Sequence, residues 1–214
     1  MDLSKSDSEI AHLAASYLIE GAAETFQDAK IKASEAIGSP SKAQLPSNVL
    51  VQQILAQNLA LLEGSKWLDR VRKMRGAALK AMRFFADFEP YLVGSVLYGT
   101  VTEYAIISVH VHNDDLEPLL WKLGDANIQY RLGETKLKTQ GNRSAVFPCL
   151  EITMSAYEFD IVVLPLAHRF NPPLSPLDGK PYQRADMTRV EQLINDNQTL
   201  FGKYLESIPL EVGP

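Results

Sequence analysis

The stretch from residue 91 to residue 112 constrains the fold most. A short apolar run ends in a Gly-Ser pair, a second glycine follows five residues after the first, and a β-branched run comes next. A glycine directly after a strand lets the backbone come close to a ligand, and the serine adds a hydroxyl beside it. Backbone N–H groups exposed after a strand end can hold a phosphate. The candidate phosphate-binding residues are Gly94, Ser95, Gly99 and Thr100.

This pattern resembles the polymerase-beta-type nucleotidyltransferase superfamily. Members carry Gly-Ser, a nearby Gly, an Asp-x-Asp strand and a third carboxylate on a later strand. Counted from the two glycines, the Asp-x-Asp aspartates would fall at Ile106 and Ser108, and neither side chain can replace a carboxylate. Asp160 lies where the third carboxylate is expected. The resemblance covers about residues 68–164 and implies a nucleotide-sized pocket with a degenerate motif.

In that family, three carboxylates hold two divalent ions, which bind the triphosphate and lower the pKa of the attacking hydroxyl. The resemblance therefore implies Asp160 as the remaining catalytic acid, a divalent metal as cofactor and a nucleoside triphosphate as a possible ligand. Since two of the three acids are missing, the leading hypothesis is a nucleotidyltransferase-like protein that binds a nucleotide or other phosphate ligand and transfers nucleotides poorly or not at all.

Two histidines on the following strand suggest a second kind of site. Side chains alternate between faces along a strand, so His110 and His112 share one face. With Asp160 on a neighbouring strand they would form a two-histidine, one-carboxylate set for a transition metal, in an active metal-dependent nucleotidyltransferase or phosphoryl-transfer enzyme. The alternative is a hydrogen-bonded or solvated histidine pair at the strand end, since Mg²⁺ prefers oxygen ligands.

The order of the expected elements indicates an α+β fold. We expect a helical module over 1–63, a nucleotidyltransferase-like core of mixed β-sheet and helices over 64–165, and a proline-rich loop with a C-terminal helix over 166–214. A helix over 66–88 carries apolar residues at intervals of three and four. Strands are expected at 91–93, 105–111, 128–132, 135–138, 144–154 and 159–164, with turns at Gly133-Glu134 and Gly141-Asn142. The last helix is expected over 186–205.

Composition narrows the class of protein. The 214 residues are 46% hydrophobic and 22% charged, which is typical of a globular domain with a sizeable core. No apolar run is long enough to span a membrane, and the polar, acidic start is unlike a signal peptide. Cys149 is the only cysteine, so no intrachain disulfide can form, and its apolar neighbours predict a buried thiol. A cytoplasmic location follows as an expectation.

The distribution of charge along the sequence indicates which classes of binding partner to expect. A net charge of −5 argues against broad coating of nucleic acid. The basic residues of the 66–88 helix are spread around it rather than aligned, so an anionic partner such as RNA is the weaker alternative to a solvated face. The acidic helical module over 1–63 gives a third hypothesis, an interaction or regulatory protein that docks a protein partner.

Overall fold

The structure is a computed structural model that describes residues 5–38, 45–141 and 143–195. Its N-terminal part consists of α1 (Lys5–Ile19), α2 (Phe26–Ile37) and α3 (Asn48–Glu63). Thr25 accepts a hydrogen bond from the Asp28 N–H at 3.1 Å and caps the start of α2 at Phe26. Fully buried alanines on α1 and α2 allow these helices to pack closely.

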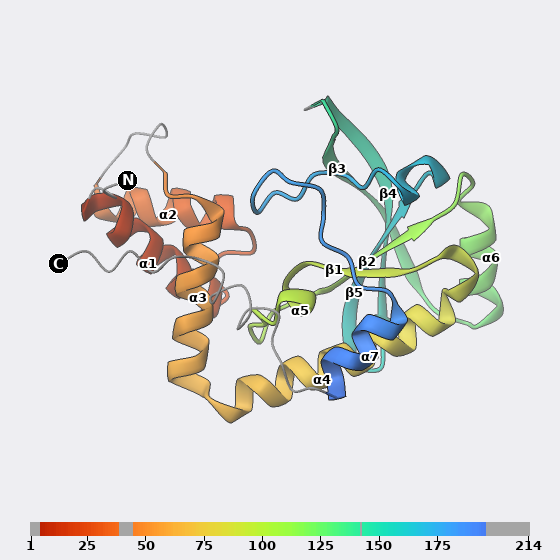
Figure 1. Cartoon of the computed structure of the whole chain (residues 1–214), viewed down its shortest axis with the longest axis horizontal. Helices are drawn as coiled ribbons and strands as arrows, with labels where there is room; N and C mark the ends of the chain where they lie inside the picture. Colours follow the sequence, from red (N-terminus) through yellow and green to blue (C-terminus); the bar gives the residue numbers. More distant parts are fainter. Residues whose placement is uncertain (1–4, 39–44, 142, 196–214) are drawn as a thin grey trace.

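A long helix connects this helical part to the sheet. α4 (Ser65–Phe84) leads into the short 3₁₀ helix η2 (Ala86–Phe88) and runs beneath the sheet in Figure 1. The predicted inward stripe is confirmed, because all of its members are buried: Trp67, Val71, Met74, Ala78, Met82 and Phe85. The larger of two buried core clusters continues from the N-terminal helices through α4 to the sheet.

Five strands form one mixed sheet, which confirms the α+β fold. They are β1 (Tyr91–Val93), β2 (Ile107–His112), β3 (Tyr130–Thr139), β4 (Arg143–Met154) and β5 (Tyr157–Leu164), in the spatial order β1-β2-β5-β4-β3. β2 and β5 are parallel, and the other neighbours are antiparallel. The expected turn at Gly133-Glu134 is wrong, because both residues continue β3 opposite Cys149 and Pro148 of β4.

The connecting helices complete the fold. They are α5 (Gly94–Tyr98), α6 (Glu117–Asp125), the 3₁₀ helix η3 (Leu166–Arg169) and α7 (Met187–Asn195). The short α5 was not expected from the sequence. The expected C-terminal helix is described as far as Asn195, and its remaining residues lie outside the described part of the chain. None of the described helices is long and apolar enough to cross a membrane.

The two faces of the sheet have different coverings. Ile107, Val109 and Val111 of β2 belong to the core packed against α4 and α6. The opposite face is crossed by residues 166–186, which we call the strap (Figure 1). The strap bonds to β3 through the Leu174 N–H and the Lys138 carbonyl at 2.6 Å. It bonds to β1 through Leu92 and Ala185, so it reaches both edges of the sheet.

Candidate functional site

The Gly-Ser corner lies where β1 meets α5. Gly94 has φ +72°, a left-handed conformation that side-chain-bearing residues rarely adopt. The N–H groups of Gly99 and Thr100 donate to the Ser95 carbonyl at 2.7 and 3.0 Å and close the short helix. A Cβ atom built on Gly94 would lie 3.7 Å from Cβ and Oγ of Ser108. The corner therefore lies directly against β2.

One row of residues crosses the whole sheet from this corner. The pairing registers place five residues side by side, in the order Val93, Ser108, Asp160, Glu151 and Arg131. Residues paired across neighbouring strands carry their side chains on the same face. The serine that replaces an expected aspartate is thus the immediate neighbour of Asp160, and Glu151 is its neighbour on the other side.

A cavity of about 320 Å³ opens over this row. Its lining includes the side chains or backbone of Gly94, Ser108, His110, Glu151, Asp160 and Tyr182. The volume lies at the lower end of the range for small-molecule sites, roughly 300–1,000 Å³. Tyr182 comes from the strap, and the other lining residues come from α5 and from all five strands, so these elements meet at one place.

Asp160 and Glu151 give the cavity a negative wall. Burial raises the pKa of Asp160, and the carboxylates of Glu151 and Glu158 raise it further, while Arg131 acts in the opposite direction. Arg131 donates to Glu151 from Nε at 2.7 Å and also from Nη2. The Arg131 side chain is 80% exposed, so this ion pair is weak and easily exchanged. Among the described residues, no basic side chain forms an ion pair with Asp160.

His110 is a neutral imidazole inside the site. It is 2% exposed, and burial, followed by His112 and Arg184, lowers its pKa to about 3. Its ring meets the Tyr182 ring edge-on at 4.8 Å, and burial raises the pKa of Tyr182 to about 12. Nδ1 of His110 has no hydrogen-bond partner among the described residues. A buried polar nitrogen without a partner is costly, so a water or ligand in the cavity is the natural partner for this ring.

His112 lies outside the cavity although it shares the face of His110. Its Nδ1 is 3.0 Å from the Glu89 carbonyl and therefore carries the proton, and its ring meets Tyr91 at 5.6 Å. Burial, then Arg184 and His168, lowers its pKa to about 4. Within the described residues, no three or more His, Cys, Asp or Glu side chains form a group that could hold a metal ion. The set of His110, His112 and Asp160 stays a prediction.

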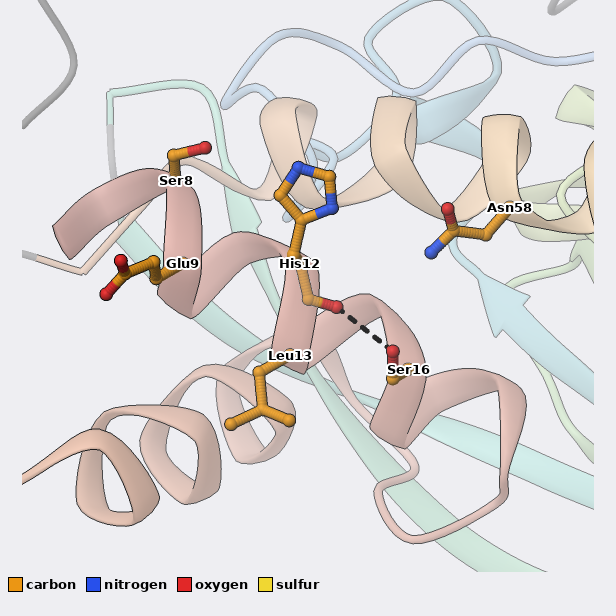
Figure 2. Close-up of a pocket in the computed structure, with 6 residues that line it drawn as sticks. All are labelled: Ser8, Glu9, His12, Leu13, Ser16 and Asn58. Atoms are coloured by element: carbon orange, nitrogen blue, oxygen red, sulfur yellow. Dashed lines mark hydrogen bonds between the residues drawn. The ribbon is translucent and has the colours of Figure 1, made fainter. Parts of the chain in front are cut away.

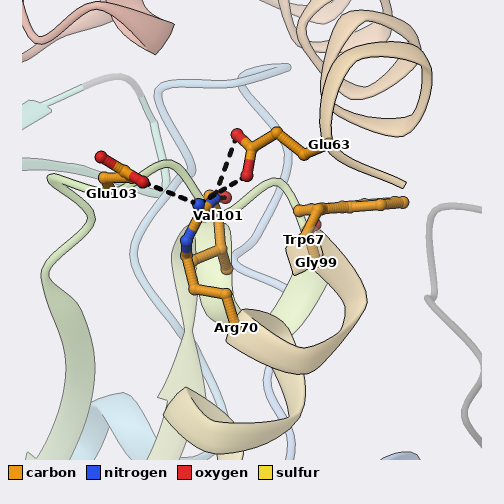
Figure 3. Close-up of polar contacts among 6 residues, drawn as sticks. All are labelled: Glu63, Trp67, Arg70, Gly99, Val101 and Glu103. Atoms are coloured by element: carbon orange, nitrogen blue, oxygen red, sulfur yellow. Dashed lines mark hydrogen bonds and ion pairs between the residues drawn. The ribbon is translucent and has the colours of Figure 1, made fainter. Parts of the chain in front are cut away.

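Three of the four expected phosphate-binding residues lie away from the cavity lining. Ser95 is half-buried in α5, and Thr100 is buried with its hydroxyl 3.3 Å from Nε2 of Gln52. The Gly99 carbonyl accepts from Nε1 of Trp67 at 2.9 Å (Figure 3). These contacts hold the segment after α5 against α3 and α4, so only Gly94 of the four faces the cavity.

Arg70 strengthens the same attachment. As Figure 3 shows, it reaches from α4 to Glu63 at the end of α3 and to Glu103 in the segment before β2. It also donates to the Val101 carbonyl at 3.2 Å. The corner and the end of the helical module are therefore parts of one polar network.

A second hollow, of about 550 Å³, lies on the surface of the helical module. Figure 2 shows its lining residues: Ser8, Glu9, His12, Leu13 and Ser16 from α1, with Asn58 from α3. The one hydrogen bond among them joins the Ser16 hydroxyl to the His12 carbonyl at 3.3 Å. The polar groups point in different directions in Figure 2, and no charged cluster forms among these six residues.

Sequence reasoning missed Glu151 and Tyr182. The signal for Glu151 was a carboxylate between Leu150 and Ile152, directly after the apolar part of this strand. Its pairing with Asp160 depends on a two-residue turn at Ser155 and Ala156, both with positive φ, and this dipeptide is not a typical hairpin turn. Tyr182 lies in a segment without periodicity, so nothing indicated its position. The predicted burial of Cys149 is confirmed.

Comparison with family models, with curated proteins and with solved structures found no match for this chain.

Proposed function

We propose that the protein is a nucleotidyltransferase-like protein that binds a nucleotide or other phosphate ligand in the cavity and transfers nucleotidyl groups poorly or not at all. One observation carries the proposal. Val93, next to Gly94, is paired with Ser108, and Ser108 is paired with Asp160, so the corner and both residues border one cavity, with a serine where the resemblance requires an acid. The chain thus combines the frame of such a site with one of its three carboxylates.

The missing acids are the reason we expect little or no nucleotidyl transfer. Nucleotidyl transfer by this route needs two divalent ions that activate the attacking hydroxyl and steady the leaving group. Ser108 offers a neutral hydroxyl, and Ile106 offers no ligand atom and is 40% exposed just before β2. Asp160 alone cannot hold two ions, so a bound triphosphate keeps its bonds.

The donors and charges of the cavity suit a phosphate only together with a cation. The Ser108 and Tyr182 hydroxyls and the neutral His110 ring are hydrogen-bond donors at its wall. The carboxylates of Asp160 and Glu151 repel a bare phosphate. Carboxylate oxygens are the ligands that Mg²⁺ prefers, usually one or two with phosphate and water completing the shell. A divalent cation, when bound, would neutralise the phosphate charge at this wall.

Binding of labelled ATP to the full chain tests the proposal. We expect saturable binding with Mg²⁺ that disappears with EDTA and weakens in Asp160→Asn. The matched control is Asp125→Asn, which changes an exposed acid on α6 and should bind as the wild type does. Absence of binding with Mg²⁺ would overturn the proposal. Mg²⁺-dependent nucleotide transfer that Asp160→Ala abolishes would overturn its inactive half.

The two alternatives remain separate proposals. An active enzyme using His110, His112 and Asp160 requires a transition metal, which elemental analysis of chelator-free protein would detect in stoichiometric amount. A docking role for the helical module draws on the exposed Leu61 and Leu62 at the end of α3, and capture of a partner should be lost in a Leu61→Ser, Leu62→Ser variant. A cytoplasmic location stays a prediction.

A further inference from the structure

We propose that the cation site of this protein has moved by one strand and lies between Asp160 of β5 and Glu151 of β4. This inference rests on the proposed binding of a phosphate through a cation. The resemblance implies ligands at positions 106 and 108, on the β2 side of Asp160, and those residues have no carboxylates. Glu151 supplies a carboxylate on the opposite side, and no sequence motif assigns it that role.

The pairing geometry brings the two carboxylates within reach of one ion. Glu151 and Asp160 are directly opposite in the antiparallel β4–β5 ladder and share the cavity face. Cβ atoms of such a pair are about 4.5–5.5 Å apart, so two carboxylate groups can turn toward a common ion. Their mutual repulsion in the half-buried cavity is relieved when a cation lies between them.

A glycine on the next strand leaves room for Glu151. Gly133 of β3 faces Cys149 of β4, and a Cβ atom built on it would lie 3.2 Å from Oε1 of Glu151. That distance is shorter than ordinary van der Waals contact, so any larger residue would push the carboxylate away. Glycine weakens a strand interior, and its presence often marks the close approach of another group.

His110 points to a ligand at the same place by an independent observation. Its ring lines the cavity, is 2% exposed, and has no hydrogen-bond partner for Nδ1 among the described residues. The neutral ring can donate to a phosphate oxygen or accept from a water on the cation. His110 is paired with Val162, two residues along β5 from Asp160. A ligand bound at the two carboxylates therefore supplies the hydrogen-bond partner that Nδ1 of His110 lacks among the described residues.

Arg131 acts as an exchangeable counter-charge. It bonds Glu151 through two guanidinium nitrogens, yet its side chain is 80% exposed and free to move into solvent. A divalent ion at Asp160 and Glu151 competes with this pair. Removing the guanidinium should therefore strengthen cation binding, whereas removing either carboxylate should weaken it.

Titration of the full chain with Mn²⁺ alone, followed by electron paramagnetic resonance of the free ion, tests the inference. We expect Glu151→Gln and Asp160→Asn each to weaken Mn²⁺ binding by at least about tenfold, since each removes one of two protein ligands. Arg131→Gln should tighten binding severalfold, and Asp125→Asn should leave it unchanged. Thermal melting of each variant shows that it is folded.

Opposite outcomes identify which idea fails. Mn²⁺ affinity that is unchanged in Glu151→Gln, or lost in His110→Gln alone, would overturn the displaced site. Absence of Mn²⁺ binding to the wild type at millimolar concentration would overturn it as well. If ATP fails to bind while Mn²⁺ binding depends on Glu151, the displaced site stands and the proposed function fails. If ATP binds with Mg²⁺ and Glu151→Gln makes no difference, the reverse holds.

Discussion

The neutral histidine in the cavity makes acid instability the most direct quantitative prediction. In the folded protein His110 has a pKa of about 3, compared with an ordinary value of 6.5 that the unfolded chain regains. Below pH 6.5 the unfolded chain therefore binds a proton at this position and the folded chain does not. Stability rises with pH in the window from about 3 to 6.5, and is lost as pH falls through it.

The magnitude follows from the width of that window. Each pH unit below 6.5 costs about 1.4 kcal/mol while the folded histidine remains neutral. At pH 5, one and a half units below, the free energy of unfolding should be lower by about 2 kcal/mol on account of this group alone. His110 is 2% exposed, so little of this cost is screened by solvent.

Urea denaturation of the wild type and of His110→Gln at pH 7 and pH 5 measures the effect. The variant should lose about 2 kcal/mol less than the wild type between the two pH values, whatever its stability at pH 7. His12→Gln is the matched control, since it removes an exposed histidine on α1 and should keep the wild-type pH dependence. An equal loss in wild type and His110→Gln would show that the imidazole is not held neutral by burial.

Three more outcomes are expected. Burial and neighbouring carboxylates raise the pKa of Asp160, so ionisation of Asp160 lowers the free energy of unfolding as pH rises above the ordinary value of 3.8. Asp160→Asn should therefore have a higher urea midpoint than the wild type at pH 7, but not at pH 3. Ser155→Asn with Ala156→Gly should add about 1–2 kcal/mol in the same measurement, because both residues have positive φ in a two-residue hairpin turn. Trp67→Phe should lower the free energy of unfolding by about 1–3 kcal/mol, because it leaves the buried Gly99 carbonyl without its hydrogen-bond donor. The Mn²⁺ affinity of this variant should be unchanged.

Elements with strong periodicity could be predicted from the sequence, and so could the strands that flank Gly94 and contain Asp160. The stripe on α4 has a spacing that only a helix brings to one side, so its burial followed from composition and order. The strands around Gly94 and Asp160 were bounded by glycine and proline. The turn expected at Gly133 was a wrong prediction, because a glycine in the sequence indicates either a turn or a strand position where another group comes close. Here that group is the Glu151 carboxylate.

Cross-strand register was the part that local sequence could not supply. Glu151 and Asp160 become neighbours only because the chain reverses at Ser155 and Ala156, a turn held in place by long strands on both sides and not by turn residues. Tyr182 reaches His110 because the strap is bonded to β1. These are long-range consequences of the whole sheet, and residues far apart in the chain determine them together.

The strap has a further consequence for the two edge strands of the sheet. The outer strands β1 and β3 would each present unpaired N–H and C=O groups to other molecules, as any open sheet does. Ala185 satisfies Leu92 on one border, and Leu174 occupies the Lys138 carbonyl on the other. The strap thus pairs with backbone groups on both edge strands. We expect that cleavage within the strap would leave both edges open to pairing with strands of another copy.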